Sequence, residues 1–258
     1  MGIRGDRIAA VDAPGSLEAA EVIDAEGRLV TPGFVDPHTH YDGQVTWDPI
    51  LAPSAWHGVT TVVMGNCGVG FAPAAPDRHG WLIELMEGVE DIPGSALAEG
   101  ITWGWESFSE YLDVIGRAPR LLDVCAQAPH GAVRAYVMGE RGAANEPASA
   151  DDLRATAEVV RAGVAAGALA FSTNRLPLHT SIHGEPVPGT FAVADELRAM
   201  AQAVASAGHG LLQAVPAGSM GEDPDAPLRE VALYVRLSRE SGCKLTFSPP
   251  EIHANPGL

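Results

Sequence analysis

Basic side chains are scarce in this sequence of 258 residues. It contains 16 Lys and Arg residues against 33 Asp and Glu residues, which gives a formal net charge of −17. A surface of this sign repels phosphate groups, so nucleic acid and anionic membrane are poor partners for the chain. Lys244 is the single lysine. Any chemistry that needs a lysine elsewhere in the chain is therefore excluded.

Several sequence signatures are also absent. The three cysteines, Cys67, Cys125 and Cys243, are odd in number, widely spaced and without a Cys-x-x-Cys pair, so we expect neither a disulfide framework nor a zinc ribbon. The chain lacks a phosphate-binding loop and a Gly-x-Ser-x-Gly nucleophile elbow. No apolar run approaches the roughly 20 residues of a membrane-spanning helix. Residues 1–11 lack the features of a signal peptide, and we expect a soluble cytoplasmic protein.

From residue 29 onward, apolar runs of strand length alternate with helical patterns. The runs at 29–35, 59–64, 121–126, 168–172, 210–215 and 245–247 are apolar on both faces, which favours a parallel sheet covered by helices. Ser149 and Asp152 form a capping-box pattern before one helix, and Gly208 and Gly242 follow two further helices. This alternation fits an open doubly wound sheet or a (β/α)8 barrel. About six strand–helix units are present, so a barrel would be incomplete.

The segment before residue 29 has a different pattern. Short β-type runs at 7–11 and 21–24, separated by turn residues, predict a small β element that would not be stable alone. We therefore divide the chain into residues 1–28, a small β element, and residues 29–258, a partial strand–helix barrel. Residues 73–101 read as an excursion over the strand ends, with one helix near 81–86.

Potential metal ligands follow the first two predicted strands. Asp36, His38 and His40 lie two positions apart after the first run, so a continuing strand would direct them to one face. Two converging imidazoles are natural metal ligands, and an acid can orient one of them. Cys67 ends the next run, and its thiolate is a strong zinc ligand. The alternatives are solvated histidines and an inert core cysteine.

These residues lie within stretches that resemble a known family. GRLVTPGFVDPHTH at 27–40 resembles the opening of the amidohydrolase superfamily. YDGQ at 41–44 and WHGVTTVVMGNCG at 56–68 resemble the N-acyl-D-amino-acid deacylase, or D-aminoacylase, branch. The similarity continues through WGWESF at 103–108 and AFSTN at 170–174, and weakens after Gly208.

The resemblance implies that residues 1–28 are part of a small β-sandwich and that residues 29–258 are a partial (β/α)8 barrel of a metal-dependent hydrolase. It also implies one or two zinc ions. It implies that His38 and His40 bind the metal and that Cys67 is a ligand that can bridge two ions. Many other amidohydrolases use instead a carboxylated lysine at the end of the fourth strand. Lys244 begins the predicted sixth strand, so the composition agrees with a cysteine-type site.

The chain also departs from the family pattern. The resemblance implies a histidine at the end of the fifth strand and another at the sixth, but LLQAV at 211–215 and TFSPP at 246–250 contain none. Gln213 is a poor substitute as a zinc ligand. The family's catalytic aspartate would follow the eighth strand, beyond residue 258, so the sequence assigns no catalytic acid–base residue.

The remaining histidines fall into two groups, apart from His183, which shares the loop at 175–189 with His179 and can equally be a solvated loop residue. His130, near a predicted strand end, and His179, in the loop after the fourth strand, are candidates for substrate binding. Structural or solvated roles are expected for His57, His79, His209 and His253.

The resulting functional hypothesis is zinc-dependent hydrolysis of a non-peptide amide C–N bond, in an N-acyl-D-amino acid. One alternative is an amidohydrolase acting on cyclic amides, and another is a degenerate, non-catalytic barrel that binds a small ligand. The expected partner is a small-molecule substrate, and the oligomeric state is left open. We expect weak activity at most from these 258 residues, and full activity from a version extended at its C-terminal end.

Overall fold

The computed structural model describes residues 1–13 and 15–248, and the chain divides into two compact units, residues 1–32 and 33–258. In the first unit, β1 (Gly2–Arg4) pairs antiparallel with β2 (Arg7–Ala10). The strand predicted at 21–24 is wrong, because no strand forms there and Val22 and Ile23 are exposed without an apolar neighbour to bury them. The assignment of this segment to a β-sandwich stays a prediction.

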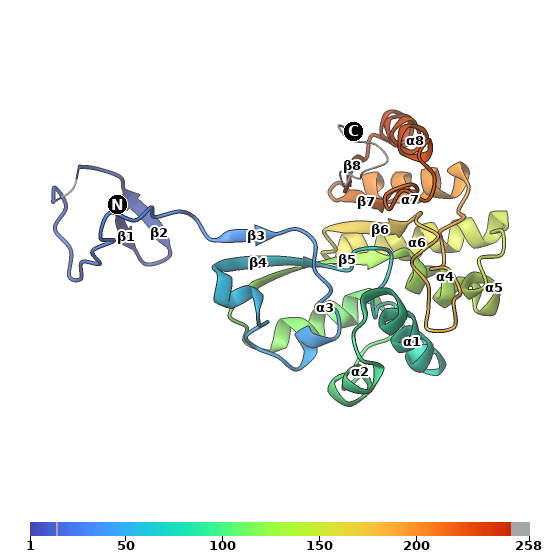
Figure 1. The fold of residues 1–258 in the computed structure, drawn as a ribbon, viewed down its shortest axis with the longest axis horizontal. Helices are drawn as coiled ribbons and strands as arrows, with labels where there is room; N and C mark the ends of the chain where they lie inside the picture. Colours follow the sequence, from blue (N-terminus) through green and yellow to red (C-terminus); the bar gives the residue numbers. More distant parts are fainter. Residues whose placement is uncertain (14, 249–258) are drawn as a thin grey trace. The chain divides into compact units, whose positions relative to one another are not determined.

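The second unit is built on one parallel sheet. Its strands are β3 (Phe34–Asp36), β4 (Val59–Met64), β5 (Asp123–Pro129), β6 (Ala170–Asn174), β7 (Leu211–Val215) and β8 (Lys244–Phe247), and they pair in chain order. A doubly wound sheet would reverse its strand order at a switch point, and the described strands show no reversal. The sheet therefore corresponds to six of the eight units of a (β/α)8 barrel (Figure 1).

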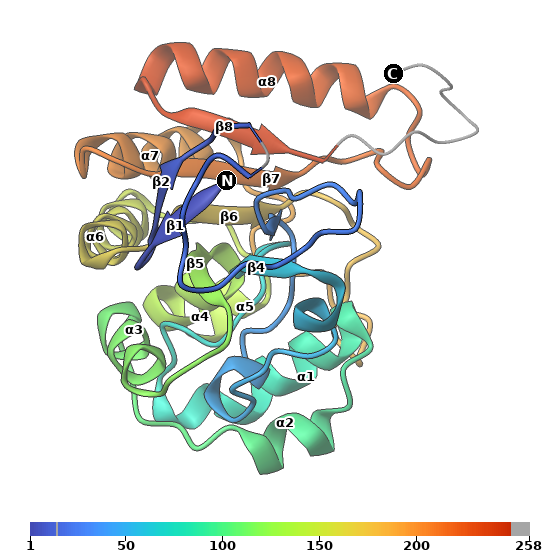
Figure 2. The same cartoon turned by 90° about the vertical axis from the view of Figure 1, so that its left-hand side faces the viewer.

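Helices connect these strands. They are α1 (His79–Glu90), α2 (Gly94–Gly100), α3 (Phe108–Arg117), α4 (His130–Met138), α5 (Glu140–Ala143), α6 (Ala150–Ala166), α7 (Ala194–Ser206) and α8 (Ala226–Ser241). The helices α6, α7 and α8 pack one against the next and cover the sheet, as Figure 2 shows. The three predicted helices after the third strand and the helix of the excursion are confirmed. None of the helices among the described residues is long and apolar enough to cross a membrane.

Two local details differ from the sequence-based expectation. The first strand begins at Phe34 rather than at residue 29, after Pro32 and Gly33. A side chain at Gly33 would collide with Thr60 on the neighbouring strand, since a Cβ would lie 2.1 Å from that threonine. The helix α3 was not anticipated, although Ser107 and Glu110 form a capping box at its start.

Candidate metal centre

The segment that carries both histidines of the His-x-His motif is fixed to the end of β4. The backbone N–H and the hydroxyl of Thr39 donate to the carbonyl oxygen of Val63 at 2.9 and 2.8 Å. The side-chain amide of Asn66 donates to the carbonyl of Thr39 at 3.2 Å. His38 and His40 flank Thr39, so these bonds hold the two imidazoles beside the loop that follows β4.

That loop turns sharply at Cys67. Cys67 has φ 57°, a left-handed conformation that is uncommon for a residue with a side chain and is found at functional sites. The next residue, Gly68, also has a positive φ, and its N–H donates to the Ser172 hydroxyl at 3.0 Å. A Cβ at Gly68 would lie 3.0 Å from the backbone nitrogen of Asn174. The turn therefore needs glycine after Cys67, and it presents the thiol to the histidines.

The three predicted ligands converge. The Cys67 Sγ atom lies 3.3 Å from Nε2 of His38 and 3.7 Å from Nε2 of His40. The three donor atoms all lie within 4.8 Å of one another. Tetrahedral zinc, with Zn–N near 2.0–2.1 Å and Zn–S near 2.3 Å, separates nitrogen and sulfur ligands by about 3.5 Å. Both measured N–S separations are close to that value, so the donor set fits a zinc ion.

Burial controls the protonation of these ligands. It lowers the pKa of His40 to about 3, with His38 and His179 acting in the same direction, and it also lowers the pKa of His38. Both imidazoles are therefore neutral near pH 7 and offer lone pairs to a cation. Burial and then Glu90 raise the pKa of the Cys67 thiol. A coordinated metal ion reverses this preference, because it deprotonates the thiol.

Two acidic side chains lie beside the three ligands. Asp42 is 3% exposed, and burial raises its pKa to about 7. Its Oδ2 atom has no hydrogen-bond partner. Glu90 ends α1, and burial together with Asp42 raises its pKa to about 8. Glu90 could not be predicted from the sequence, since no spacing rule connects a helix end in a long excursion with the strand ends.

His179 lies at the same site, as the sequence analysis anticipated for its loop. It is half-buried, its Nδ1 atom is buried without a hydrogen-bond partner, and burial lowers its pKa. The proximity of His38 lowers the pKa of His179 further, and His179 in turn lowers that of His40. By contrast, His183 on the same loop is exposed and pairs with Glu84 at 3.4 Å.

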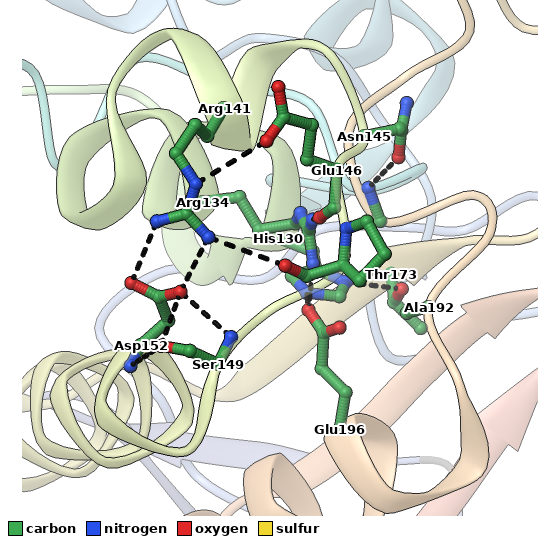
Figure 3. A network of polar contacts seen from close by, with 12 residues as sticks. His130, Arg134, Arg141, Asn145, Glu146, Ser149, Asp152, Thr173, Ala192 and Glu196 are labelled. Carbon is green, nitrogen blue, oxygen red and sulfur yellow. Dashed lines mark hydrogen bonds and ion pairs between the residues drawn. The ribbon is translucent and has the colours of Figure 1, made fainter.

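His130 belongs to a different, closed network. It is fully buried, with Nδ1 2.8 Å from the Thr173 hydroxyl and Nε2 3.1 Å from Oε1 of Glu196. Arg134, one turn along α4, pairs with the same carboxylate, as Figure 3 shows. Both ring nitrogens of His130 are engaged inside the protein. This network leaves neither ring nitrogen free in the present structure, and the role of His130 in substrate binding stays a prediction.

The other histidines lie away from the three ligands. His79 stacks on Trp103 with a centroid separation of 3.6 Å, and His57 and His209 are exposed. His253 lies outside the described residues. The same stacking, together with the contact between Trp103 and Trp105, places these aromatic residues in a local core.

The fifth strand of the barrel sheet, β7, contributes an amide instead of an imidazole. Oε1 of Gln213 accepts a hydrogen bond from the Ser172 hydroxyl at 2.6 Å, and its Nε2 atom is buried without a partner. Lys244 is exposed at the start of β8 and not at its carboxyl end, where Phe247 lies. Within the described part of the chain, a bridging lysine at this site is therefore excluded.

A parallel barrel sheet that presents metal-binding side chains at the carboxyl ends of its strands has the geometry of a metal-dependent enzyme. Residues 21–256 match the model of a family described as the amidohydrolase family, and the chain belongs to that family. It is 28% identical to the D-aminoacylase of Alcaligenes xylosoxydans xylosoxydans over 258 residues, which cover 100% of this chain and 48% of that protein.

Two further comparisons agree. The N-acyl-D-aspartate deacylase of the same organism is 28% identical over 250 residues, covering 96% of this chain and 44% of the relative. A structure of D-aminoacylase with a binuclear metal centre superimposes with a TM-score of 0.63 and 26% identity, over 83% of this chain and 39% of that one. The chain thus spans less than half the length of the curated relatives it matches.

Proposed function

We propose that this chain carries the metal-binding part of a zinc-dependent hydrolase that cleaves the amide C–N bond of N-acyl-D-amino acids. The convergence of His38, His40 and Cys67 at the carboxyl edge of the barrel sheet carries the proposal. The names of the similar proteins, D-aminoacylase and N-acyl-D-aspartate deacylase, support the substrate class.

The site residues would divide the work as follows. His38, His40 and Cys67 would hold one or two zinc ions, and zinc supplies polarisation of a carbonyl group and activation of water. Thr39 and Asn66 fix the backbone of the histidine segment, so the imidazoles are oriented before the metal binds. His179, whose pKa is affected by its proximity to His38, would contact the substrate.

The direct test is hydrolysis of a panel of N-acetyl-D- and N-acetyl-L-amino acids by the zinc-loaded protein. The 258-residue chain is compared with a longer translation product that includes the downstream coding sequence. We expect turnover of the D-series by the longer product, weak turnover by the 258-residue chain, and none after His38→Ala plus His40→Ala. Hydrolysis that survives the double substitution would contradict the proposal.

A degenerate barrel that only binds a small ligand is favoured by one observation, namely Gln213 at the position where the family carries a histidine. Binding of an N-acyl-D-amino acid without turnover by either product would support that alternative. Turnover of a cyclic amide in place of the N-acyl amino acids would instead support the cyclic-amide hydrolase. The cytoplasmic location stays a prediction from the sequence.

A further inference from the structure

Glu90 reaches the three proposed ligands from outside the strand ends. It is the last residue of α1, and Asp91, with φ 55°, ends the helix directly after it. The Oε1 atom of Glu90 lies 3.3 Å from Nε2 of His40, and the Glu90 side chain is 18% exposed. The same carboxyl group interacts with the Cys67 thiol. One carboxyl group therefore contacts His40 and lies close to the Cys67 thiol.

The contact between Glu90 and His40 lacks the alignment of a hydrogen bond. Oε1 is buried and has no hydrogen-bond partner, although Nε2 of His40 lies within ion-pair distance. Two ligand atoms that both point at one metal ion, rather than at each other, show this combination of a short distance and poor hydrogen-bond alignment. In tetrahedral zinc sites, with Zn–N and Zn–O near 2.0–2.2 Å, nitrogen and oxygen ligands lie about 3.4 Å apart. The measured 3.3 Å is close to that separation.

The position is costly for a carboxylate unless a cation is present. The C-terminal end of a helix carries partial negative charge and disfavours an acidic side chain. Asp42 and Asp91 add negative charge nearby. Within residues 1–13 and 15–248, neither Glu90 nor Asp42 pairs with an arginine or with Lys244. Asp42 is almost fully buried with an unpartnered oxygen, so the surroundings of Glu90 point independently to a missing positive charge.

We propose that Glu90 is a further ligand of the metal centre formed by His38, His40 and Cys67. Glu90 adds a metal donor from the end of α1. The described residues of β7 and β8 supply no histidine that could do so. The inference rests on the proposed function, because it concerns the same metal. It makes the excursion between β4 and β5 part of the site and not only a cover over the strand ends.

The test is Glu90→Gln, which keeps the size of the side chain and removes its charge. The matched control is Glu84→Gln on the same helix, where the carboxylate is 46% exposed and pairs with His183. The zinc dissociation constant is measured by competition with a chromophoric chelator. We expect Glu90→Gln to weaken zinc binding by about 10–100-fold and Glu84→Gln to leave it unchanged. The cobalt-substituted proteins provide a second readout, since a lost ligand alters the visible d–d bands.

The possible outcomes distinguish a failure of the Glu90 assignment from a failure of the whole metal site. Wild-type protein that binds no zinc would overturn both the proposed function and this inference. Wild type and Glu90→Gln with equal zinc affinity and equal cobalt spectra would overturn the inference alone. Circular dichroism of the metal-free variant checks its fold. Should the variant not fold, a crystal structure of zinc-loaded wild type decides: a Glu90 oxygen within about 2.2 Å of the ion is expected, and one beyond about 3 Å excludes coordination.

Discussion

The Sγ atom of Cys67 lies 3.3 Å from Nε2 of His38, although 29 positions separate the two residues in the sequence. The contact exists because β3 and β4 are parallel neighbours whose carboxyl ends meet at one edge of the sheet. Asn66 connects the two ends through its bonds to Thr39 and Val63. The site therefore depends on the pairing of the first two barrel strands, and the following predictions test it and its surroundings.

The purified chain is expected to bind zinc through the two histidines and Cys67. Replacing both imidazoles, in His38→Ala plus His40→Ala, removes two of the three converging donors and should abolish stoichiometric binding. Metal analysis after dialysis provides the measurement. His57→Ala plus His209→Ala is the matched control, because both of those histidines are exposed away from the site. Equal zinc content in the wild type and the His38/His40 variant would exclude the site.

The stability of the metal-free protein should depend on Asp42. Its pKa is about 7 in the folded state against about 3.9 in an unfolded chain. Between these values the folded state holds more protons, so the free energy of unfolding decreases as the pH rises from 4 to 7. A shift of about 3 pH units corresponds to at most roughly 4 kcal/mol. The free energy of unfolding of Asp42→Asn, taken relative to that of wild type, should therefore be higher at pH 8 than at pH 4.

Urea unfolding in the presence of a chelator measures this effect of Asp42. Glu90, whose pKa is raised in the same direction, leaves a residual pH dependence in the variant. The control is Asp113→Asn, at an exposed position on α3. A stability difference between wild type and Asp42→Asn that is the same at both pH values would show that folding does not shift the pKa of Asp42.

The network around Glu196 should contribute to stability and not to metal binding. Glu196→Gln leaves Arg134 buried without its counter-charge, and the expected loss is about 3–5 kcal/mol. Glu158→Gln, which breaks an exposed pair with Arg161, should cost less than about 1 kcal/mol. The pKa of Glu196 is lowered to about 2 despite its burial, by His130 and Arg134. Its stabilisation is present above about pH 4.5 and is lost as the pH falls through 2.

Denaturant titrations at pH 7 and pH 3 measure that contribution, and zinc analysis accompanies them. Unchanged zinc affinity in Glu196→Gln is expected, because His130 and its partners form a network separate from the three ligands. A loss of zinc on substitution would show that this buried network extends to the metal centre.

His179 is expected to contribute to substrate binding. His179→Ala should weaken the binding of an N-acetyl-D-amino acid by about tenfold, equivalent to about 1.4 kcal/mol, with unchanged zinc content. His183→Ala, on the same loop but paired with Glu84 at the surface, is the control. Calorimetric titration of the zinc-loaded proteins gives the dissociation constants. A fall in zinc content instead would assign His179 to the metal, and no change in either quantity would remove it from the site.

Much of the barrel sheet could be predicted, because hydrophobic runs and helix caps are patterns of residues close together in the sequence. The run at 59–64 coincides with β4, and Ser149 with Asp152 caps α6 as expected. The strand predicted at 21–24 failed, since its two consecutive apolar residues, Val22 and Ile23, are exposed and find nothing to pack against. The first barrel strand was predicted too long because local hydrophobicity does not show where pairing with β4 begins.

For the site, the sequence by itself determined which donors stand at the strand ends. The His-x-His motif, Cys67 and the absence of any lysine but Lys244 indicated a cysteine-type donor set, because motif and composition are properties of the chain alone. Strand period did not contribute, since β3 ends at Asp36, before both histidines. Only the tertiary structure decided that His130 is enclosed with Glu196 while Glu90 and His179 reach the ligands. These outcomes depend on how helices and loops remote in sequence pack over the sheet, and no local pattern encodes that packing.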